Sequence, residues 1–198
     1  MGFPEIVYAE GKSVSQLERI IDAHRIAARG VLATRVRPEQ AEALTDGDWD
    51  EEARTWILPP GQPARPGCVG LLSAGTSDRP VLAEAANTLA FLGIACVRVE
   101  DAGVAGPHRL HKRLNEFSTC DAVLVFAGFE AALASVAAAL LPQPIIGVPT
   151  SVGYGVAAEG HAALHAMLAS CANGLTVMNI DNGCGAALAA ARILRETS

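Results

Sequence analysis

The stretch CVGLLSAGTSDRPVLAEAANTLAFL, residues 68–92, indicates the fold class of this chain. Its first six residues are almost all apolar and predict a buried strand over residues 68–73. A loop of glycine and hydroxyl residues follows, and Pro80 opens a segment that predicts a helix over residues 80–92. A continuous apolar strand followed closely by a helix is typical of a parallel sheet that helices cover on both faces.

The same pattern repeats four more times toward the C-terminus. Apolar runs predict strands at 94–100, 122–126, 144–148 and 175–180, and the segments after them predict helices at 109–117, 130–141, 161–171 and 185–195. Five such units predict the α/β class, with a flavodoxin-like doubly wound parallel sheet. Ligands of these sheets bind at the carboxyl ends of the strands, where this chain has its glycine-rich loops.

The residues before this region predict a small N-terminal α/β subdomain over residues 1–58. Strand-like segments at 5–9 and 30–36 flank a helical segment at 14–29. The proline- and glycine-rich residues 59–67 have the composition of a linker, which leaves 68–198 as the main domain.

Composition narrows the functional classes. The net charge of -6 argues against a nucleic-acid partner, because phosphate binding needs a concentrated basic face. No apolar run approaches the roughly 20 residues that cross a bilayer, and no basic, apolar leader opens the chain. The five cysteines are scattered, so we expect a cytoplasmic protein in which most thiols are small core residues: Cys68, Cys96, Cys120, Cys171 and Cys184.

The first two loops each combine glycine with groups that bind anions. The loop before Pro80 contains Gly75, Thr76, Ser77 and Asp78 at a helix start. Its free N–H groups would bind a phosphate or carboxylate, although a capped helix explains the same residues. In the second loop Gly106 allows close approach of the backbone, and His108 and Arg109 open a helix. Arg109 could clamp a phosphate, or it could be a solvated basic helix end.

The third loop, with Gly128 and Glu130, puts a carboxylate at the start of an apolar helix. Glu130 either complements the helix dipole or, with a pKa raised by apolar surroundings, serves as a general base.

The last two loops and one cysteine complete the candidates. The fourth loop is long and rich in hydroxyls, which favours binding by Thr150, Ser151 and Tyr154. In the fifth, Asp181 and Asn182 could hold a ribose or a metal ion, although Asn-Gly is also a common turn. Cys171 lies at a predicted helix end, and its surroundings alone favour a structural role.

In this order the loops resemble those of the LarB family of nickel-pincer-nucleotide biosynthesis. The matching motifs are GFPEIVYAEGK at 2–12, AGTSD at 74–78, DAGVAGPHR at 101–109, AGFE at 127–130, VPTSVGYG at 148–155, SC at 170–171 and NIDNG at 179–183. The sheet domain also resembles the PurE family of aminoimidazole-ribonucleotide (AIR) carboxylases and mutases, through Ser77-Asp78-x-Pro80 and His108-Arg109. The PurE third loop carries a catalytic histidine, whereas this chain has no histidine between His111 and His161 and offers Glu130 instead.

The LarB resemblance implies a pyridinium-3,5-biscarboxylic acid mononucleotide synthase. Such an enzyme carboxylates nicotinic acid adenine dinucleotide (deamido-NAD) with CO2 or bicarbonate and hydrolyses the phosphoanhydride to release AMP. It implies that Cys171 is the nucleophile and Glu130 the base, with Ser77 and Asp78 around the CO2. The implied substrate-binding residues are Gly75, Thr76, Gly106, His108, Arg109, Gly128, Thr150, Ser151, Tyr154, Asp181 and Asn182.

The resemblance also implies partners and cofactors. We expect Mg²⁺ or another divalent cation for the hydrolysis, no biotin, no nucleic-acid or membrane partner, and a homo-octamer. Two alternatives remain open, namely a PurE-like AIR carboxylase or mutase and a non-catalytic nucleotide-binding module. The module would have no need of Cys171 and Glu130 together.

Overall fold

The computed structural model describes residues 3–194, and its larger sheet has five strands in the order β6-β5-β7-β8-β9. The strands are β5 (Cys68–Ser73), β6 (Ala95–Val99), β7 (Ala122–Ala127), β8 (Ile145–Pro149) and β9 (Leu175–Val177). All neighbouring pairs are parallel. This order, with the first strand between the second and the third, is that of flavodoxin-like sheets. The predicted α/β fold class is confirmed.

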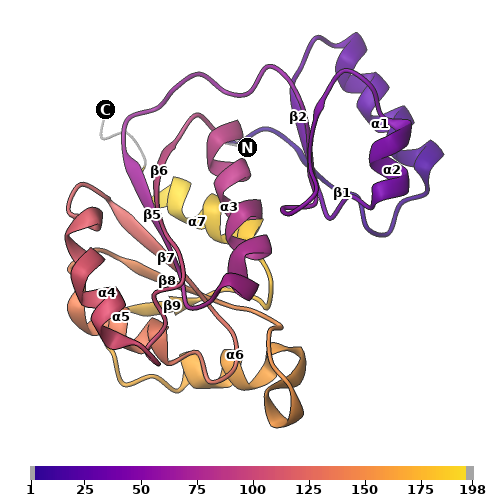
Figure 1. Ribbon diagram of the computed structural model, residues 1–198. Helices are drawn as coiled ribbons and strands as arrows, with labels where there is room; N and C mark the ends of the chain where they lie inside the picture. The colour runs from indigo at the N-terminus through magenta and orange to yellow at the C-terminus, as the bar shows by residue number, and fades with distance from the viewer. Residues whose placement is uncertain (1–2, 195–198) are drawn as a thin grey trace.

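Helices cover both faces of this sheet (Figure 1). One core layer packs the sheet against α3 (Arg79–Phe91) and α7 (Gly183–Ile193). The other packs it against α4 (Pro107–Arg113), α5 (Ala132–Leu140) and α6 (His161–Leu168). Short 3-10 segments, η1 (Thr76–Asp78), η2 (Leu114–Phe117) and η3 (Gly155–Gly160), adjoin α3, α4 and α6. No helix within residues 3–194 is both long and apolar enough to cross a membrane.

Several predicted bounds differ from the structure. The helix predicted from residue 130 begins at Ala132, because Ala131 adopts a left-handed conformation with φ 50°. The helix predicted to reach residue 171 ends at Leu168, and the strand predicted to reach residue 180 ends at Val177. The predicted end of the last helix, residue 195, lies outside the described residues.

The N-terminal subdomain contains more structure than the sequence predicted. Its sheet has the order β1-β2-β4-β3, with β1 (Ile6–Tyr8) parallel to β2 (Val31–Thr34). Helix α1 (Val14–Ile26) begins with a capping box, in which Ser13 and Gln16 bond each other's backbone N–H. Three elements were not predicted, namely α2 (Pro38–Ala43), β3 (Asp48–Asp50) and β4 (Thr55–Leu58).

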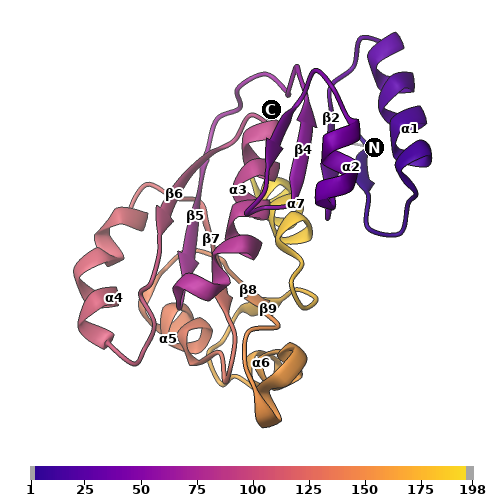
Figure 2. The same ribbon diagram turned by 45° about the vertical axis from the view of Figure 1, so that its right-hand side comes forward.

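The subdomain lies against α3 (Figure 2). Polar contacts join the two at successive turns of that helix. Asn87 donates to Asp50 at 2.9 Å and to Thr55 at 2.8 Å. One turn earlier, the buried Glu84 pairs with Arg35 at 3.2 Å. Helix α3 therefore serves both the sheet and the subdomain.

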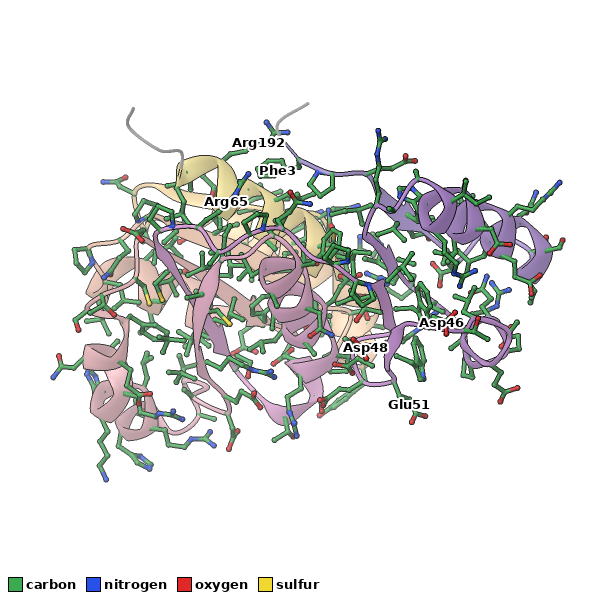
Figure 3. The ribbon with its side chains drawn as sticks, turned by 90° about the horizontal axis from the view of Figure 1, so that it is seen from above. Phe3, Asp46, Asp48, Glu51, Arg65 and Arg192 are labelled. Carbon is green, nitrogen blue, oxygen red and sulfur yellow. The ribbon has the colours of Figure 1, made fainter. Side chains whose placement is uncertain are left out.

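A second connection joins the start of the chain to α7. The ring of Phe3 lies between Arg65 of the linker region and Arg192 of α7, with guanidinium-to-centroid distances of 6.0 and 5.2 Å (Figure 3). Cation–π contacts of this kind hold the first described residues against the main sheet domain.

Candidate active site

A cavity of about 320 Å³ lies at the carboxyl ends of the central strands. Its walls come from the loops after β5, β6, β7 and β8, and they include Ser77, Asp78, Arg109, Phe129, Glu130 and Val152. The cavity spans the point between β5 and β7 where the strand order reverses. Doubly wound sheets bind their ligands at this point.

Asp78 is the buried carboxyl group of this cavity, with only 3% of its surface exposed. It accepts hydrogen bonds from the Thr150 hydroxyl at 2.6 Å and the Gly75 N–H at 2.8 Å. Desolvation raises the pKa of Asp78 above its usual value, although hydrogen bonds from Thr150, Gly75 and Gly128 act in the opposite direction. Asp78 therefore joins three loops at the edge of the cavity.

Two glycines allow these loops to approach one another closely. A Cβ on Gly128 would lie 2.3 Å from the Val152 carbonyl oxygen, which accepts a bond from the Phe129 N–H at 2.8 Å. A Cβ on Gly103 would lie 2.6 Å from the carbonyl oxygen of Ala74. Larger residues at either position would force the cavity walls apart.

Glu130 lines the cavity from the turn between β7 and α5. It is exposed, so the apolar surroundings expected for it from the sequence are absent, and it lies outside α5, which begins at Ala132. Its neighbours Phe129 and Ala131 both have left-handed backbones, with φ 51° and 50°. Such strain in residues other than glycine concentrates at functional sites.

The second loop contributes Arg109 but not His108. Arg109 lines the cavity and pairs with Asp101 at 2.6 Å. Gly106 leaves room for this guanidinium, since a Cβ there would lie 2.8 Å from its Nε. His108 is exposed and is not part of the cavity wall, and neither is Thr76.

Cys171 lies outside the cavity. It follows α6 in an exposed turn, where the hydroxyl of its neighbour Ser170 is 2.7 Å from that of Ser135 on α5. It is the one exposed cysteine of the five. Burial raises the pKa of the Cys120 thiol to about 12 and that of Cys184 to about 11. Cys171 is thus the accessible thiol of the five, but it does not line the cavity that contains Glu130.

Other residues of the fourth loop, together with the fifth loop, face a second hollow. Ser151 and Asp181 line a second cleft, of about 190 Å³, between the subdomain and the sheet domain, and the Ser151 N–H donates to Asp181 at 2.8 Å. Asn182 caps α7 by accepting from the Gly185 N–H at 2.8 Å. The ring of Tyr154 is largely exposed and stands edge-on to that of Phe129, 5.3 Å between centroids.

Sequence reasoning missed two residues of this second cleft, Arg35 and Arg54. Neither lies in a motif. Arg35 reaches the cleft because the subdomain packs against α3, where Glu84 pairs with it across 49 positions of sequence. No local pattern could have indicated that contact.

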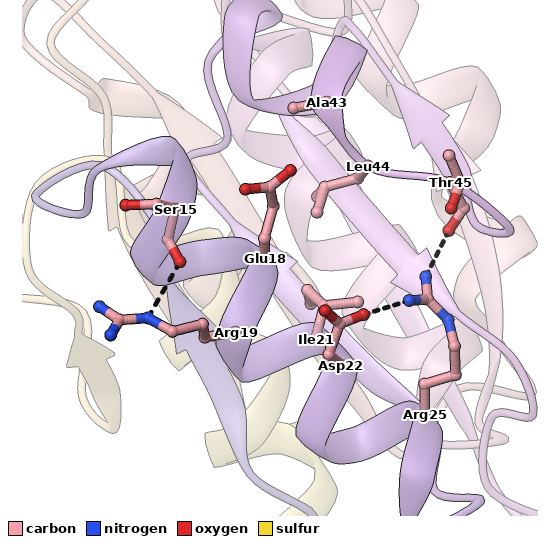
Figure 4. A pocket seen from close by; sticks show the side chains of 9 residues that line it. All are labelled: Ser15, Glu18, Arg19, Ile21, Asp22, Arg25, Ala43, Leu44 and Thr45. Atoms are coloured by element: carbon pink, nitrogen blue, oxygen red, sulfur yellow. Dashed lines mark hydrogen bonds and ion pairs between the residues drawn. The ribbon is translucent and has the colours of Figure 1, made fainter.

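A wider groove of about 610 Å³ lies between α1 and the end of α2 (Figure 4). Its charged side chains bond within the groove, Arg25 to Asp22 and Arg19 to the Ser15 carbonyl at 3.2 Å. It lies far from the carboxyl ends of the main sheet, and we assign it no part in the chemistry.

The expected divalent cation has no ready-made protein site within residues 3–194. No three side chains of histidine, cysteine, aspartate or glutamate come together there as ligands. Asp78 and Asp181, the two aspartates on our list of candidates, line separate hollows. We therefore assign no step of the reaction to a protein-held metal.

Comparison with known proteins divides the chain at the same place as its two sheets. The model of the AIR carboxylase family matches residues 68–198, and that of the LarB/PurE-like N-terminal domain matches residues 1–59. An uncharacterised protein of Methanocaldococcus jannaschii is 37% identical over 210 residues, covering 98% of this chain and 80% of that protein. Phosphoribosylaminoimidazole carboxylase of Candida albicans is 31% identical over 134 residues, covering 64% of this chain and 22% of that enzyme.

Proposed function

The chain belongs to the LarB family of AIR carboxylase-type proteins, and from this membership we propose that it carboxylates the pyridinium ring of deamido-NAD. The same enzyme would then hydrolyse the phosphoanhydride to give pyridinium-3,5-biscarboxylate mononucleotide and AMP. CO2 or bicarbonate is the co-substrate. The family supports a carboxylase, and the residues of the cavity support this particular substrate.

The observation that carries the proposal is Glu130 in the wall of the cavity, on the third loop. A PurE-like reaction needs a histidine on that loop, and this chain has none between His111 and His161. Glu130 supplies a carboxylate base at the same strand end. It lines the same cavity as Asp78, the pKa of which is raised by desolvation.

The proposed chemistry makes an electron-poor ring able to attack CO2. The thiolate of Cys171 adds to the ring carbon para to the nitrogen and converts the pyridinium into a neutral dihydropyridine with enamine character. The free meta carbon then uses the enamine electrons to form a bond to CO2. Glu130 removes the proton from that carbon. The C–H electrons restore the aromatic ring while the carbon–sulfur bond breaks and releases the thiolate.

The other cavity residues bind and orient the reactants. Ser77 and Asp78 adjoin the mainly apolar wall formed by Ala74, Ala127 and Leu133, an environment suited to CO2. Arg109 lies at the edge of the same cavity, where it can exchange its partner Asp101 for a substrate phosphate. Water then cleaves the phosphoanhydride.

The position of Cys171 leads us to propose that assembly completes the site. The cavity of one chain lacks a cysteine in its wall, while the thiol of Cys171 is exposed on the α5–α6 side. Five of the exposed large apolar side chains belong to this part of the chain: Phe129, Leu140, Tyr154, Val156 and Leu168. Soluble monomers rarely leave such patches uncovered. A second copy on this surface would bring its Cys171 to the cavity.

We therefore expect a closed homo-oligomer, and the family resemblance suggests an octamer. The alanine face of α7 is covered by α3 within the chain, so the contacts should involve α5 and α6 rather than α7. Multi-angle light scattering at micromolar concentration should give a multiple of the chain mass, 20.5 kDa. Replacement of Val156 and Leu168 by glutamate should shift the protein toward the monomer. A stable wild-type monomer would contradict the expectation.

The function is tested by incubating the protein with deamido-NAD and ¹³C-bicarbonate and analysing the products by mass spectrometry. The proposal predicts AMP and a mononucleotide that carries the label in a second ring carboxylate. Labelling of aminoimidazole ribonucleotide instead would identify a PurE-like enzyme. Binding of deamido-NAD without any product would identify a nucleotide-binding module.

A further inference from the structure

The cleft between the N-terminal subdomain and the sheet domain adjoins the active-site cavity. Arg35 and Arg54 line it from the subdomain, and Asp181 lines it from the loop after β9. Ser77 and Val152 line both the cleft and the cavity that contains Asp78. The two hollows therefore share a wall of two side chains.

Each arginine of the cleft is held by two of its nitrogens. Arg35 donates from Nε to Glu84 at 3.2 Å and from Nη2 to the carbonyl oxygen of Asp181. Arg54 donates from Nε to the Val36 carbonyl at 3.3 Å and from Nη2 to that of Arg35 at 3.5 Å, and its Nη2 also pairs with the exposed carboxylate of Glu10 at 3.5 Å. Within residues 3–194 these bonds leave Nη1 of both side chains without a hydrogen bond. Two fixed guanidinium groups with a spare nitrogen are suited to phosphate oxygens.

The carboxylates that line the cleft all have partners, and because Glu84 is paired with Nε of Arg35, a phosphate would bind Arg35 through Nη1. The pairs are Glu84 with Arg35, Glu52 with Arg79, and Asp181 with the N–H of Ser151.

Three residues that line the cleft have a strained backbone conformation. Arg35, Arg54 and Asp181 all adopt left-handed conformations, with φ 55°, 51° and 55°. L-residues other than glycine keep such conformations only where the surrounding fold holds them, and they cluster at ligand sites. This observation is independent of the hydrogen bonds.

The size of the substrate requires more room than the cavity alone. Ligand pockets have volumes of roughly 300–1,000 Å³, and the cavity of about 320 Å³ is at the lower end of that range. Deamido-NAD has two ring systems, two riboses and two phosphates.

We propose that the two hollows form one dinucleotide site, which the N-terminal subdomain completes. The pyridine half occupies the cavity, and the diphosphate and adenylate half pass Ser77 and Val152 into the cleft. Arg35 and Arg54 bind oxygens of the phosphate on the adenylate side there, while Arg109 at the edge of the cavity meets the phosphate on the pyridine side. The subdomain thereby selects a dinucleotide over a mononucleotide. This proposal rests on the proposed function, because it divides that substrate between the hollows.

The test compares Arg54→Gln with Arg37→Gln by calorimetric titration of the full chain. Arg37 is a matched control in the same subdomain, since it also donates to backbone carbonyls, those of Glu10 and Lys12, but lies outside the cleft. Arg54→Gln should bind deamido-NAD on the order of 10- to 100-fold more weakly, as expected for a lost charge-assisted bond. Its affinity for nicotinic acid mononucleotide should be unchanged, and Arg37→Gln should match the wild type for both ligands.

A second variant guards against misfolding of Arg54→Gln. Ser151 is exposed and lines the cleft but not the cavity, so Ser151→Phe should fill the cleft and exclude the dinucleotide while the mononucleotide still binds. If both variants bind the dinucleotide as tightly as the wild type does, the divided site is wrong, even when the wild type converts deamido-NAD. Failure of the wild type to bind or convert deamido-NAD would overturn the proposed function as well.

Discussion

Cys171→Ala should abolish carboxylation while binding of deamido-NAD stays close to that of the wild type. Without the thiolate the pyridinium ring has no nucleophilic carbon, and loss of a catalytic nucleophile costs on the order of 10⁴-fold or more in rate. Cys171 is exposed in its turn, so the alanine variant should keep the wild-type stability. The measurement is formation of labelled product, with binding followed by calorimetry.

The matched control is Cys120→Ala. Cys120 is buried, 3.6 Å from the sulfur of Cys68, and its raised pKa keeps the thiol protonated. Its replacement should cost about 1 kcal/mol of stability and leave the carboxylation rate unchanged. Full carboxylation activity of Cys171→Ala would contradict the covalent mechanism. Loss of carboxylation in a folded Cys120→Ala variant would contradict the assignment of Cys171 as the nucleophile.

Mixing inactive chains tests whether Cys171 acts across a subunit contact. Co-expressed Cys171→Ala and Glu130→Gln chains should regain about a quarter of the wild-type activity. In a random mixture about half of the cavities keep Glu130, and about half of the chains beside them keep Cys171. No regain in mixed oligomers would show that each chain uses its own Cys171.

Glu130→Gln should lose on the order of 10²–10⁴-fold in carboxylation, the range for a missing general base. An amide does not accept the ring proton at neutral pH, whereas it keeps the size of the side chain. Hydrolysis of the phosphoanhydride should be less affected, because it removes no proton from the ring. The two products, AMP and the labelled carboxylate, are measured in one assay.

Glu159→Gln is the control for this substitution. Glu159 is likewise an exposed glutamate in a loop before a helix, but it lies outside both hollows. Its replacement should leave both products at the wild-type rate. If Glu130→Gln carboxylates at the wild-type rate, Glu130 is not the base, and Asp78 becomes the candidate.

The sheet could be predicted from sequence more accurately than the turns that form the cavity. Strand β7 is buried at all six positions, so its apolar run has a single interpretation. The turn before α5 was misjudged, because alanine favours helix and nothing near Ala131 indicates a left-handed backbone. Tertiary contacts between Gly128 and Val152 impose that turn.

Some residues of the candidate site could be predicted from the sequence, and others could not. Asp78 and Glu130 could be placed together because they follow β5 and β7, whose carboxyl ends meet at one edge of the sheet. His108 follows β6 at a greater distance along the chain, and it is exposed outside the cavity wall, because the side on which a helical residue faces depends on packing. The exclusion of Cys171 from the cavity depends on where α6 ends, and its predicted end was three residues too late.

Two buried carboxyl groups, Asp78 at the start of α3 and Glu84 within it, each favour proton uptake when the protein folds. Desolvation raises the pKa of each, for Glu84 against the opposing charge of Arg35. A carboxyl group with a raised folded pKa stabilises the fold fully below its unfolded pKa, about 4, and that contribution is lost as the pH rises through the folded value. Asp78→Asn should therefore weaken the gain in unfolding free energy that these groups give as the pH falls from neutral toward the unfolded value of about 4, as measured by urea denaturation. An unchanged gain would mean that Asp78 takes up no proton on folding. A dinucleotide that carries negative charge into these hollows would draw in the same protons, so its affinity should rise as the pH falls across that window.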